Sequence, residues 1–367
     1  MAGSIFGKHF QISTWGESHG KALGVVVDGC PAGIELCEED IQKDLDRRRP
    51  GNSPFASPRK EKDAVEILSG VFEGKTTGTP ISLIVYNTNQ RSYDYSEISK
   101  LYRPGHADFT YDQKYGFRDY RGGGRSSGRE TTARVAAGAI AKKILQEFNV
   151  DITAYTLSIG PVEIDKSKFD KSEIYNNFLA MPDKEAAKAA ADYVQNVMDN
   201  EDSAGGIIEC IVTGLPTGVG EPVFEKLDAM LAKAIFSIGA VKGLEFGSGF
   251  EAAKKTGWEN NDFFRYDENG KITKLTNHAG GISGGISDGF PIVFRTAIKP
   301  TPSIHRMQQT INKNGENADI QVEGRHDPII VPRAVVVVEA MTALTLVDYL
   351  FQRIFSRIDL IKKALLD

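Results

Sequence analysis

The stretch best suited to chemistry is a run of glycines and arginines, Arg121-Gly122-Gly123-Gly124-Arg125-Ser126-Ser127-Gly128-Arg129-Glu130. Its glycines let backbone N–H groups approach a ligand closely. The run leads into a predicted helix N-terminus, where unpaired N–H donors favour an anion. The arginines add planar donors suited to phosphate or carboxylate. A flexible turn is the structural alternative, but the clustering of arginine favours an anion site. The Lys-Ser/Thr ending of a Walker phosphate loop is missing.

Three of the six histidines lie in short segments that also carry glycine and charge: Gly16-Glu17-Ser18-His19-Gly20, Arg103-Pro104-Gly105-His106-Ala107-Asp108 and Gly324-Arg325-His326-Asp327-Pro328. Histidine titrates near neutrality and is the usual proton carrier in catalysis, so these are candidate acid–base groups. A lone histidine is more often structural, and the spacing of the six forms no compact metal motif. The first segment lacks the Gly-x-Ser-x-Gly order of a serine hydrolase, so that mechanism is set aside.

Two further motifs are ambiguous when taken singly. Arg47-Arg48-Arg49-Pro50-Gly51 closes a predicted helix, and arginines there interact favourably with the helix dipole, which is a sufficient structural reason for them. The glycine-rich stretch 277–285 lacks the strand–GxGxxG–helix context of a dinucleotide fold. Tight packing or a cofactor pocket would both explain it.

These motifs need elements to position them, and the hydrophobic pattern predicts helices and strands intermixed along the chain. Helices are expected at 38–49, from Ser127 onward, and at 183–198, 222–236 and, with or without a break, 332–366. Strands are expected at 22–28, 80–86, 206–212 and 290–297. Ser127 and Glu130 have the spacing of a capping box. The segment 101–128 shows neither period, although its aromatic residues argue against disorder.

The order of these elements lacks the regular alternation of a barrel or a doubly wound sheet. No repeat is evident, and no Pro/Ser-rich linker divides the chain. We therefore predict an α/β fold of layered sheets and helices (α+β layered), with residues 1–367 forming a single large domain.

Composition narrows the functional classes. The 367 residues are 41% hydrophobic and 25% charged with a net charge of -5, so nothing in the bulk balance indicates nucleic acid or an acidic membrane as a partner. The three cysteines form no metal-like spacing and fit a reducing compartment. The first residues lack the apolar run of a signal peptide, and the aliphatic run 334–338 is too short to span a membrane. We expect a soluble cytoplasmic protein.

Together with Ser69-Gly70-Val71, Thr76-Thr77-Gly78, Ser237-Ile238-Gly239-Ala240-Val241-Lys242-Gly243 and Lys299-Pro300-Thr301, the motifs resemble the chorismate synthase family. The match covers nearly the whole chain, and several ordered motifs are far more specific than one glycine loop. The resemblance implies a β-α-β sandwich core and a homotetramer. The apolar stretch 344–355 is expected to contribute to an interface between subunits.

The resemblance also implies an activity. The family converts 5-enolpyruvylshikimate 3-phosphate to chorismate by an anti 1,4-elimination of phosphate, in the pathway to aromatic amino acids. It needs reduced FMN although no net redox change occurs. A substrate with two carboxylates and a phosphate, beside an anionic flavin, demands many fixed cations. The clustered arginines could supply them despite the negative net charge.

Roles for individual residues follow from the same resemblance. His19 would protonate the leaving phosphate, His106 would protonate or stabilise the anionic flavin, and Asp327 would assist removal of the C6 proton through flavin N5. Substrate contacts would come from Ser18, Arg48, Arg103 and Arg129, with Arg325 shared between substrate and flavin. Positions matching flavin contacts are Arg125, Ser126, Ser127, Gly239, Ala240, Gly284, Lys299, Pro300, Thr301, Pro302, Ser303 and Arg325. Both histidines are expected to become protonated mainly in the loaded complex, because bound anions favour the charged imidazole.

One position departs from the family pattern. Many relatives carry an arginine for NADP contact a few residues after the Arg-Pro-Gly stop, where this chain has Pro54 and the nearest downstream arginine is Arg59. NADPH is therefore expected at most as an indirect source of reducing equivalents. Two other functions remain open: a flavin oxidoreductase with net electron transfer, and a non-catalytic protein that binds flavin or anions.

Overall fold

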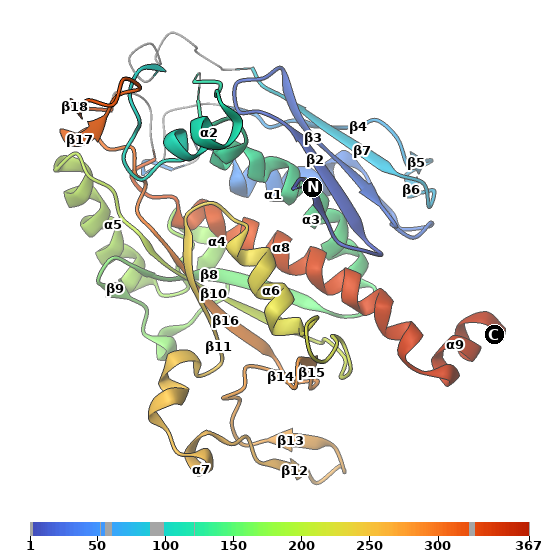
Figure 1. The fold of residues 1–367 in the computed structure, drawn as a ribbon. Coiled ribbons are helices and arrows are strands. Elements are labelled where there is room, and N and C mark those ends of the chain that lie inside the picture. The colour runs from blue at the N-terminus through green and yellow to red at the C-terminus, as the bar shows by residue number, and fades with distance from the viewer. Residues whose placement is uncertain are drawn as a thin grey trace.

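Two antiparallel sheets enclose a layer of helices in the computed structural model of the protein, which describes residues 3–51, 53–55, 61–88, 99–120, 122–322 and 327–366 (Figure 1). The first sheet has the strand order β1-β2-β3-β7-β4, and its strands are β1 (Ile5–Phe6), β2 (Gln11–Gly16), β3 (Ala22–Asp28), β7 (Ile81–Tyr86) and β4 (Val65–Ile67). Alternation explains which face is buried: Ile81, Leu83 and Val85 of β7 point into the core, while the residues between them do not.

The second sheet has the order β11-β16-β10-β8-β9 and is also antiparallel. Its strands are β8 (Asp151–Ile159), β9 (Val162–Glu163), β10 (Gly206–Thr213), β11 (Val241–Phe246) and β16 (Ile292–Ile298). Every second residue of β16, from Ile292 to Ile298, is buried, and β16 lies between β10 and β11. Whatever follows Ile298 therefore emerges at the opposite end of the sheet from the segment that precedes Ile292.

The helix layer consists of α1 (Glu38–Arg48), α3 (Thr131–Gln146) and α8 (Val331–Gln352). Helix α3 packs on the first sheet and α8 on the second, and the two helices pack against each other. Gly138 permits this close approach, because a Cβ there would lie 2.6 Å from the Cα of Ala340. One large hydrophobic cluster runs through both sheets and the helices between them. The β-α-β sandwich that the family resemblance implies is confirmed.

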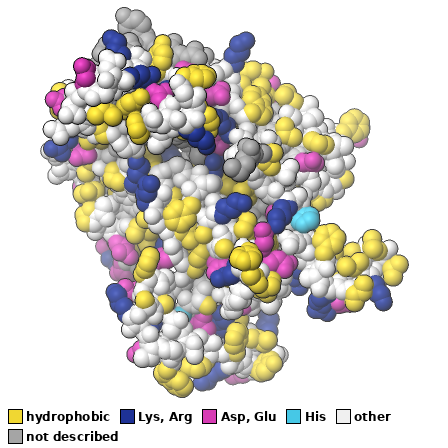
Figure 2. Space-filling view, in the orientation of Figure 1, with side chains coloured by type: hydrophobic (Ala, Val, Ile, Leu, Met, Phe, Trp, Pro, Cys, Tyr) yellow, Lys and Arg dark blue, Asp and Glu magenta, His cyan; other side chains and the backbone are white. Residues whose placement is uncertain are grey.

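The remaining elements surround this sandwich. The further helices are α2 (Asp108–Tyr115), α4 (Glu173–Asn176), α5 (Lys184–Asp199), α6 (Leu227–Phe236), α7 (Gly257–Asn260) and α9 (Ile358–Leu366). Short hairpins are β5–β6 (Val71–Phe72, Lys75–Thr76), β12–β13 (Phe264–Tyr266, Ile272–Lys274), β14–β15 (Ile282–Ser283, Ile286–Ser287) and β17–β18 (Gln308–Ile311, Asn317–Ile320). The α9 arm projects from the body (Figure 1), and apolar side chains gather along it (Figure 2).

Four details differ from the sequence-based expectations. Segment 101–128 contains α2, which has no apolar period because the one residue it buries is Asp108, and which ends at the left-handed Gly116. Helix α6 begins at Leu227 rather than 222, after Val223 adopts a positive φ of 65°. Ser127 does cap a 3-10 turn, Gly128–Glu130, but Glu130 pairs with Arg134 instead of closing a capping box.

The fourth difference concerns the apolar stretch 344–355. Residues 344–350 are buried inside the chain's own core, so their assignment to a subunit interface was wrong, and exposed apolar residues begin at Ile354. Within the described residues, Val331–Ser356 is long and apolar enough to cross a membrane, but 94% of its most apolar window is buried in the molecule. That burial identifies it as a core helix of the sandwich.

Candidate active site

His19 lies in the tight turn that joins β2 to β3. Gly20 N donates to Glu17 O at 3.1 Å, which closes the turn, and the hydroxyl of Ser18 lies 3.0 Å from Nδ1 of His19. Gly122 packs against the imidazole so closely that a Cβ at this position would collide with the ring. The glycine-rich run that precedes α3 therefore meets the histidine turn directly, as the two strongest sequence motifs would require if they shared a site.

Asn87, directly after β7, links the histidine turn to an arginine of the 3-10 turn that precedes α3. Its Nδ2 donates to the carbonyl oxygens of Glu17 at 3.1 Å and Gly20 at 2.8 Å. Its Oδ1 accepts from Nε of Arg129 at 2.9 Å. The backbone N–H of Asn87 donates to Lys21 O at 3.0 Å. One amide side chain thus touches both the His19 turn and the predicted substrate clamp.

Arg48 and Arg129 share one buried carboxylate, Asp63. Nη1 of Arg48 lies 2.8 Å from Asp63 Oδ2, and Nη1 of Arg129 pairs with the other oxygen, Oδ1. The side chain of Asp63 is fully buried, and its φ of 48° places it in the left-handed region, which aspartate tolerates better than most residues. Glu61 lies 2.6 Å from the same Nη1 of Arg129.

Each nitrogen of the Arg48 guanidinium is hydrogen-bonded within the protein. It also donates to the hydroxyls of Thr131 and Thr132 and to Gly128 O, all at the entrance of α3. Burial and, second, the charge on Arg333 lower the pKa of Arg48 to about 10, while Asp63 acts in the opposite direction. Because this value is well above neutrality, Arg48 remains a cation inside the protein. Buried charges of this kind persist only when they are paired.

Arg129 differs from Arg48 because one of its nitrogens is open. Its Nη2 is buried and has no hydrogen-bond partner among the described residues, although Nε and Nη1 are both engaged. A buried donor left unpaired costs free energy, so such an atom points to a missing acceptor. Helices α3 and α8 both begin at the end of the helix layer where Arg129 lies (Figure 1), and helix N-termini favour negative charge. The arrangement therefore suits an anion.

Asp327 stands beside this group at the start of α8. Its carboxylate pairs with Nη1 of Arg333, and Nε of Arg333 donates to Arg48 O at 2.9 Å. Asp327 is therefore linked to Arg48 through one intervening arginine.

His106 belongs to a second charged cluster around Asp108. Nε and Nη2 of Arg103 each lie 2.8 Å from the Asp108 carboxylate, and Nδ1 of His106 lies 3.0 Å from Oδ1. Arg118 adds a contact at 3.3 Å. Although burial acts to raise it, hydrogen bonds from Arg103 and His106 hold the pKa of Asp108 well below its usual range. Asp108 therefore stays ionised and fixes the orientation of both neighbours.

The segment 299–303 packs against the loop that carries His106. Lys299 Nζ donates to Gly105 O at 2.7 Å, and Lys299 N donates to Ala240 O at 2.9 Å, which brings three sequence motifs together. Ala240 has a φ of 72°, an unusual backbone conformation for alanine. Burial, with a smaller contribution from Lys242, lowers the pKa of Lys299. An open depression of about 420 Å³ lies at this loop, lined by Tyr102, Arg103, Pro104, Gly105, His106, Phe109, Thr110, Gln309, Thr310 and Ile311.

The two clusters adjoin through segment 202–204. Ala204 N donates to Pro328 O at 2.9 Å, and Ser203 Oγ donates to Thr301 O at 2.7 Å. One short segment thus contacts both the chain beside Asp327 and the chain beside Lys299. On the α3 side, Arg134 Nη1 donates to Ser237 Oγ at 2.6 Å, which joins the start of α3 to the 237–240 loop. The candidate residues therefore surround one region at the end of the helix layer.

Some of the expected residues stand apart. The guanidinium of Arg125 folds back onto β2, where it donates to Thr14 Oγ1 at 2.7 Å and Gly16 O at 3.2 Å. Ser126 and Ser127 bond within their own turn. Gly284 lies in the hairpin β14–β15, before β16, whereas Lys299 follows β16. Six steps of about 3.3 Å place the two ends of β16 about 20 Å apart. Within one chain, Gly284 is thus not beside Lys299. Arg325, Arg121 and His326 lie outside the described residues.

Several contributors to the site were not predicted. Asp108 could have been found, because it lies inside the segment that contains His106, two residues away. Asp63, Asn87 and Arg333 carried no comparable signal. Each follows or begins an element without a motif around it, and its importance comes from contacts distant in sequence.

Fold and site together define a layered α/β protein with an arginine- and histidine-rich candidate site at one end of its helix layer. A family model described as chorismate synthase matches residues 10–351. The chorismate synthase of Lachnospira eligens is 66% identical over 99% of both chains, and that of Lachnoclostridium phytofermentans is 64% identical over 99% of both. A crystal structure of chorismate synthase superposes with a TM-score of 0.75 at 34% identity, covering 98% of this chain and 96% of the other. The chain belongs to the chorismate synthase family, whose members are lyases.

Proposed function

We propose that the protein converts 5-enolpyruvylshikimate 3-phosphate into chorismate by anti 1,4-elimination of phosphate, with reduced FMN and no net oxidation. The observation that carries this proposal is the unpaired Nη2 of Arg129, a buried cationic donor on the guanidinium that is fixed by Asp63 and Asn87, next to the His19 turn. An anionic substrate would complete the hydrogen bonding of this donor.

The arginines hold the substrate anions in this proposal. Arg129 offers an open donor, Arg48 contributes a buried positive charge behind it, and Arg103 contributes charge from the second cluster. Since Asp63 and Asp108 fix these guanidinium groups, little reorganisation is needed when substrate binds. Preorganised cations of this kind stabilise charge that develops on a departing phosphate.

His19 is the proposed proton donor to the leaving phosphate. Its Nδ1 lies 3.0 Å from the Ser18 hydroxyl, and Nε2, on the opposite side of the ring, is the nitrogen proposed to donate the proton. A bound phosphate beside the ring favours the imidazolium, so the proton is available when the substrate is in place. Asp327, held by Arg333, is the proposed group that assists loss of the proton from C6.

The residues around His106 fit a flavin by their chemistry. Thr301 Oγ1 is buried without a hydrogen-bond partner among the described residues, Lys299 supplies a cation, and the depression beside His106 is open to a planar ligand. Reduced FMN, when bound, supplies electron density to the substrate and is not consumed. His106, backed by Asp108, can hold a proton toward an anionic ring. The other proposed contacts are Arg125, Ser126, Ser127, Gly239, Ala240, Pro300, Pro302, Ser303 and Arg325.

The test is anaerobic turnover of 5-enolpyruvylshikimate 3-phosphate with a catalytic amount of pre-reduced FMN, following phosphate and chorismate together. Many equivalents of both products per flavin are expected, because the reaction returns the flavin to its starting state. One equivalent or fewer, with flavin oxidised in proportion, would favour a flavin oxidoreductase. Flavin binding with no product at all would favour a binding protein. The matched variant is His19→Gln, which keeps a polar side chain but has no proton to transfer near neutral pH, and it should lose turnover.

We further propose that reduced flavin reaches the protein from another source, with NADPH acting at most indirectly, because Pro54 replaces the arginine expected for NADP contact. Addition of NADPH and oxidised FMN without a reductase should give no anaerobic turnover.

We also propose a cytoplasmic homotetramer. Four chains of 40.1 kDa give about 160 kDa, which sedimentation equilibrium should report, and a value near 40.1 kDa would contradict the assembly.

A further inference from the structure

The side-chain amide of Asn87 can take only one orientation. Its nitrogen faces two carbonyl oxygens, of Glu17 and Gly20, and both need a donor. Its oxygen faces Nε–H of Arg129, which needs an acceptor. Reversing the amide would place oxygen against oxygen and N–H against N–H, so the hydrogen-bond pattern settles the assignment. These three polar contacts are therefore specific.

These contacts fix the geometry of two different functional segments. The carbonyls of Glu17 and Gly20 flank His19 in sequence, so holding both on one NH₂ group holds the turn that presents the imidazole. Nη1 of Arg129 is held by Glu61 and Asp63, and Asn87 holds Nε. With Nε and Nη1 both fixed, the plane of the guanidinium is set, and this determines where the open Nη2 points.

We propose that Asn87 is a positioning residue that sets the placement of His19 relative to Arg129. This inference rests on the proposed function, in which His19 protonates the phosphate and Arg129 binds a substrate anion. Asn87 itself need not touch the substrate. Its Nδ2 acts on the turn of the proton donor and its Oδ1 acts on the anion clamp. We call these contacts the two arms, and a substitution can change one while keeping the other.

Asn87→Asp separates them. The oxygen that replaces Nδ2 would face the carbonyls of Glu17 and Gly20 and repel them, while the other oxygen would still accept from Arg129. We expect kcat to fall by about 10- to 100-fold, because the proton donor is displaced. KM should rise as well, because the new carboxylate places a negative charge beside the anion clamp. Asn87→Ala removes both arms, so kcat should fall similarly and KM should rise by about 10-fold.

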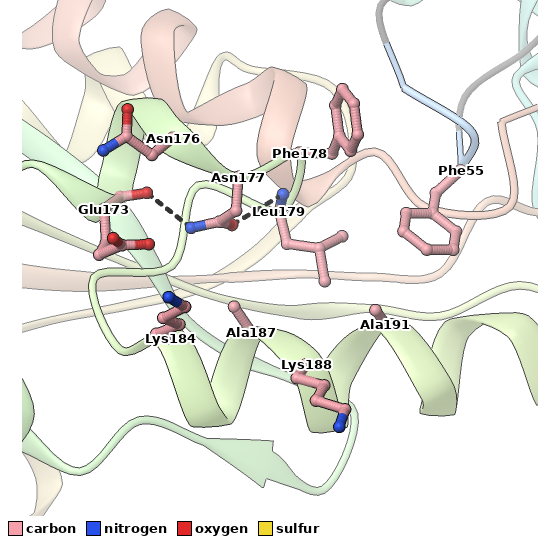
Figure 3. A pocket seen from close by; sticks show the side chains of 10 residues that line it. All are labelled: Phe55, Glu173, Asn176, Asn177, Phe178, Leu179, Lys184, Ala187, Lys188 and Ala191. Carbon is pink, nitrogen blue, oxygen red and sulfur yellow. Dashed lines mark hydrogen bonds between the residues drawn. The ribbon is translucent and has the colours of Figure 1, made fainter.

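Asn177 provides a matched control. Its Nδ2 donates to Glu173 O at 2.6 Å and Met181 O at 2.8 Å, and its Oδ1 accepts from Leu179 N at 3.1 Å and Met181 N at 3.3 Å. This asparagine lies at a separate hollow of about 260 Å³ beside α4 and α5, which shares no residue with the candidate site (Figure 3). Asn177→Asp should lower stability through the same kind of repulsion and leave kcat and KM unchanged.

A readout independent of activity is the imidazole ¹⁵N spectrum of histidine-labelled protein without ligands, with His19 assigned by its loss in His19→Gln. In Asn87→Asp the His19 signals should shift or broaden while those of His278 and His305 stay in place, and in Asn177→Asp none should move. Unchanged His19 signals together with wild-type kcat in Asn87→Asp would overturn the proposal. Failure of both Asn87 variants to fold would assign Asn87 a structural role and overturn it equally.

The two levels of inference can fail separately. Absence of turnover in the wild-type protein would contradict the proposed function, and the ¹⁵N spectrum would still decide whether Asn87 positions His19. Turnover in the wild type with an unaffected Asn87→Asp variant would contradict the positioning role alone.

Discussion

At the residue scale, the cations of the site are held by carboxylates of the same chain. Asp63 holds Arg48 and Arg129, Asp108 holds Arg103, and these carboxylates are themselves buried. Bringing several guanidinium groups into one buried region costs free energy through repulsion and desolvation, and paired carboxylates offset both. The positive charge of the site is therefore organised before an anion arrives, although the chain carries a net charge of -5.

Asp63→Asn tests this organisation. Asparagine adopts a positive φ as readily as aspartate, so the φ of 48° should be kept while the charge between Arg48 and Arg129 is lost. We expect the free energy of unfolding in urea to fall by about 3 to 5 kcal/mol, because two buried guanidinium groups lose their shared counter-charge. Asp46→Asn, at the partly exposed pair with Arg49 on α1, is the control and should cost less than about 1 kcal/mol. Equal costs would mean that burial adds nothing to the Asp63 pairs.

Asp108→Asn should show a pH-dependent effect. The pKa of Asp108 lies well below its usual range in the folded protein, so the ionised carboxylate stabilises the fold. For a depressed carboxyl pKa, this contribution is present above the unfolded value of about 4 and is lost as pH falls toward the folded value. The difference in unfolding free energy between wild type and variant should therefore be constant from pH 8 to about pH 5 and shrink only in stronger acid. A difference that changed between pH 6 and 8 would contradict this account.

At the element scale, local patterns decided what could be predicted. Strand β3 and helix α5 were predicted within a residue of their ends, because each shows its period clearly and α5 begins at the capping residue Asp183. Helix α2 was missed, since it buries little and is fixed by Arg–Asp pairs rather than by apolar packing.

For the candidate site too, only residues within a local motif could be predicted. His19 and His106 stand in motifs, whereas Asp63 and Asn87 gain their roles only when β4, β7 and α3 meet.

Helix α8 contains a buried charge that its apolar sequence hides. Glu339 accepts from Arg47 at 2.7 and 2.9 Å and from Lys142 at 2.5 Å, so it joins α1, α3 and α8. Burial acts to raise the pKa of Glu339, but the charges of Lys142 and Arg47 outweigh it and lower the value to about 2. The helix layer is thus joined by charge as well as by apolar packing.

Glu339→Gln should therefore destabilise the protein strongly. Two cations would lose their buried partner, and we expect the free energy of unfolding to fall by about 3 to 5 kcal/mol at pH 7. Because the folded pKa is lowered, wild type should lose this advantage as pH falls from about 4 toward 2. Lys143→Met, which breaks the more exposed 2.6 Å pair with Asp40 between the same helices α3 and α1, should cost less than about 1 kcal/mol. Urea titrations of the wild type and both variants at pH 7, 4 and 2 would measure the contrast and its loss in acid, and a loss at pH 7 in Glu339→Gln no larger than that of Lys143→Met would refute it.

At the scale of the whole molecule, the sandwich brings together segments that are far apart in sequence. The site uses the turn after β2, the end of α1, the start of α3, the loop after β16 and the start of α8. No continuous stretch of the sequence contains all of these segments. Hydrophobic periodicity therefore could not predict that they meet, whereas the resemblance to a family did. The placement of Gly284 at the other end of β16 also emerges only at this scale.

The α9 arm allows one more test, because it projects from the sandwich (Figure 1) and can be removed without cutting into the core. No residue of α9 is buried, Leu365 and Leu366 are 77% and 79% exposed, and the family match ends at residue 351. Truncation after Ser356 should therefore leave the free energy of unfolding of the body unchanged within error and preserve elimination activity per chain. Urea unfolding, turnover with pre-reduced FMN, and sedimentation of the truncated protein would be measured together. The control is the double substitution Leu365→Ser and Leu366→Ser in the full-length chain, which keeps the backbone and removes apolar surface. A smaller assembly in both variants would place α9 at a subunit contact. A large loss of stability in a variant that sediments like wild type would instead contradict the conclusion that the body folds without the arm.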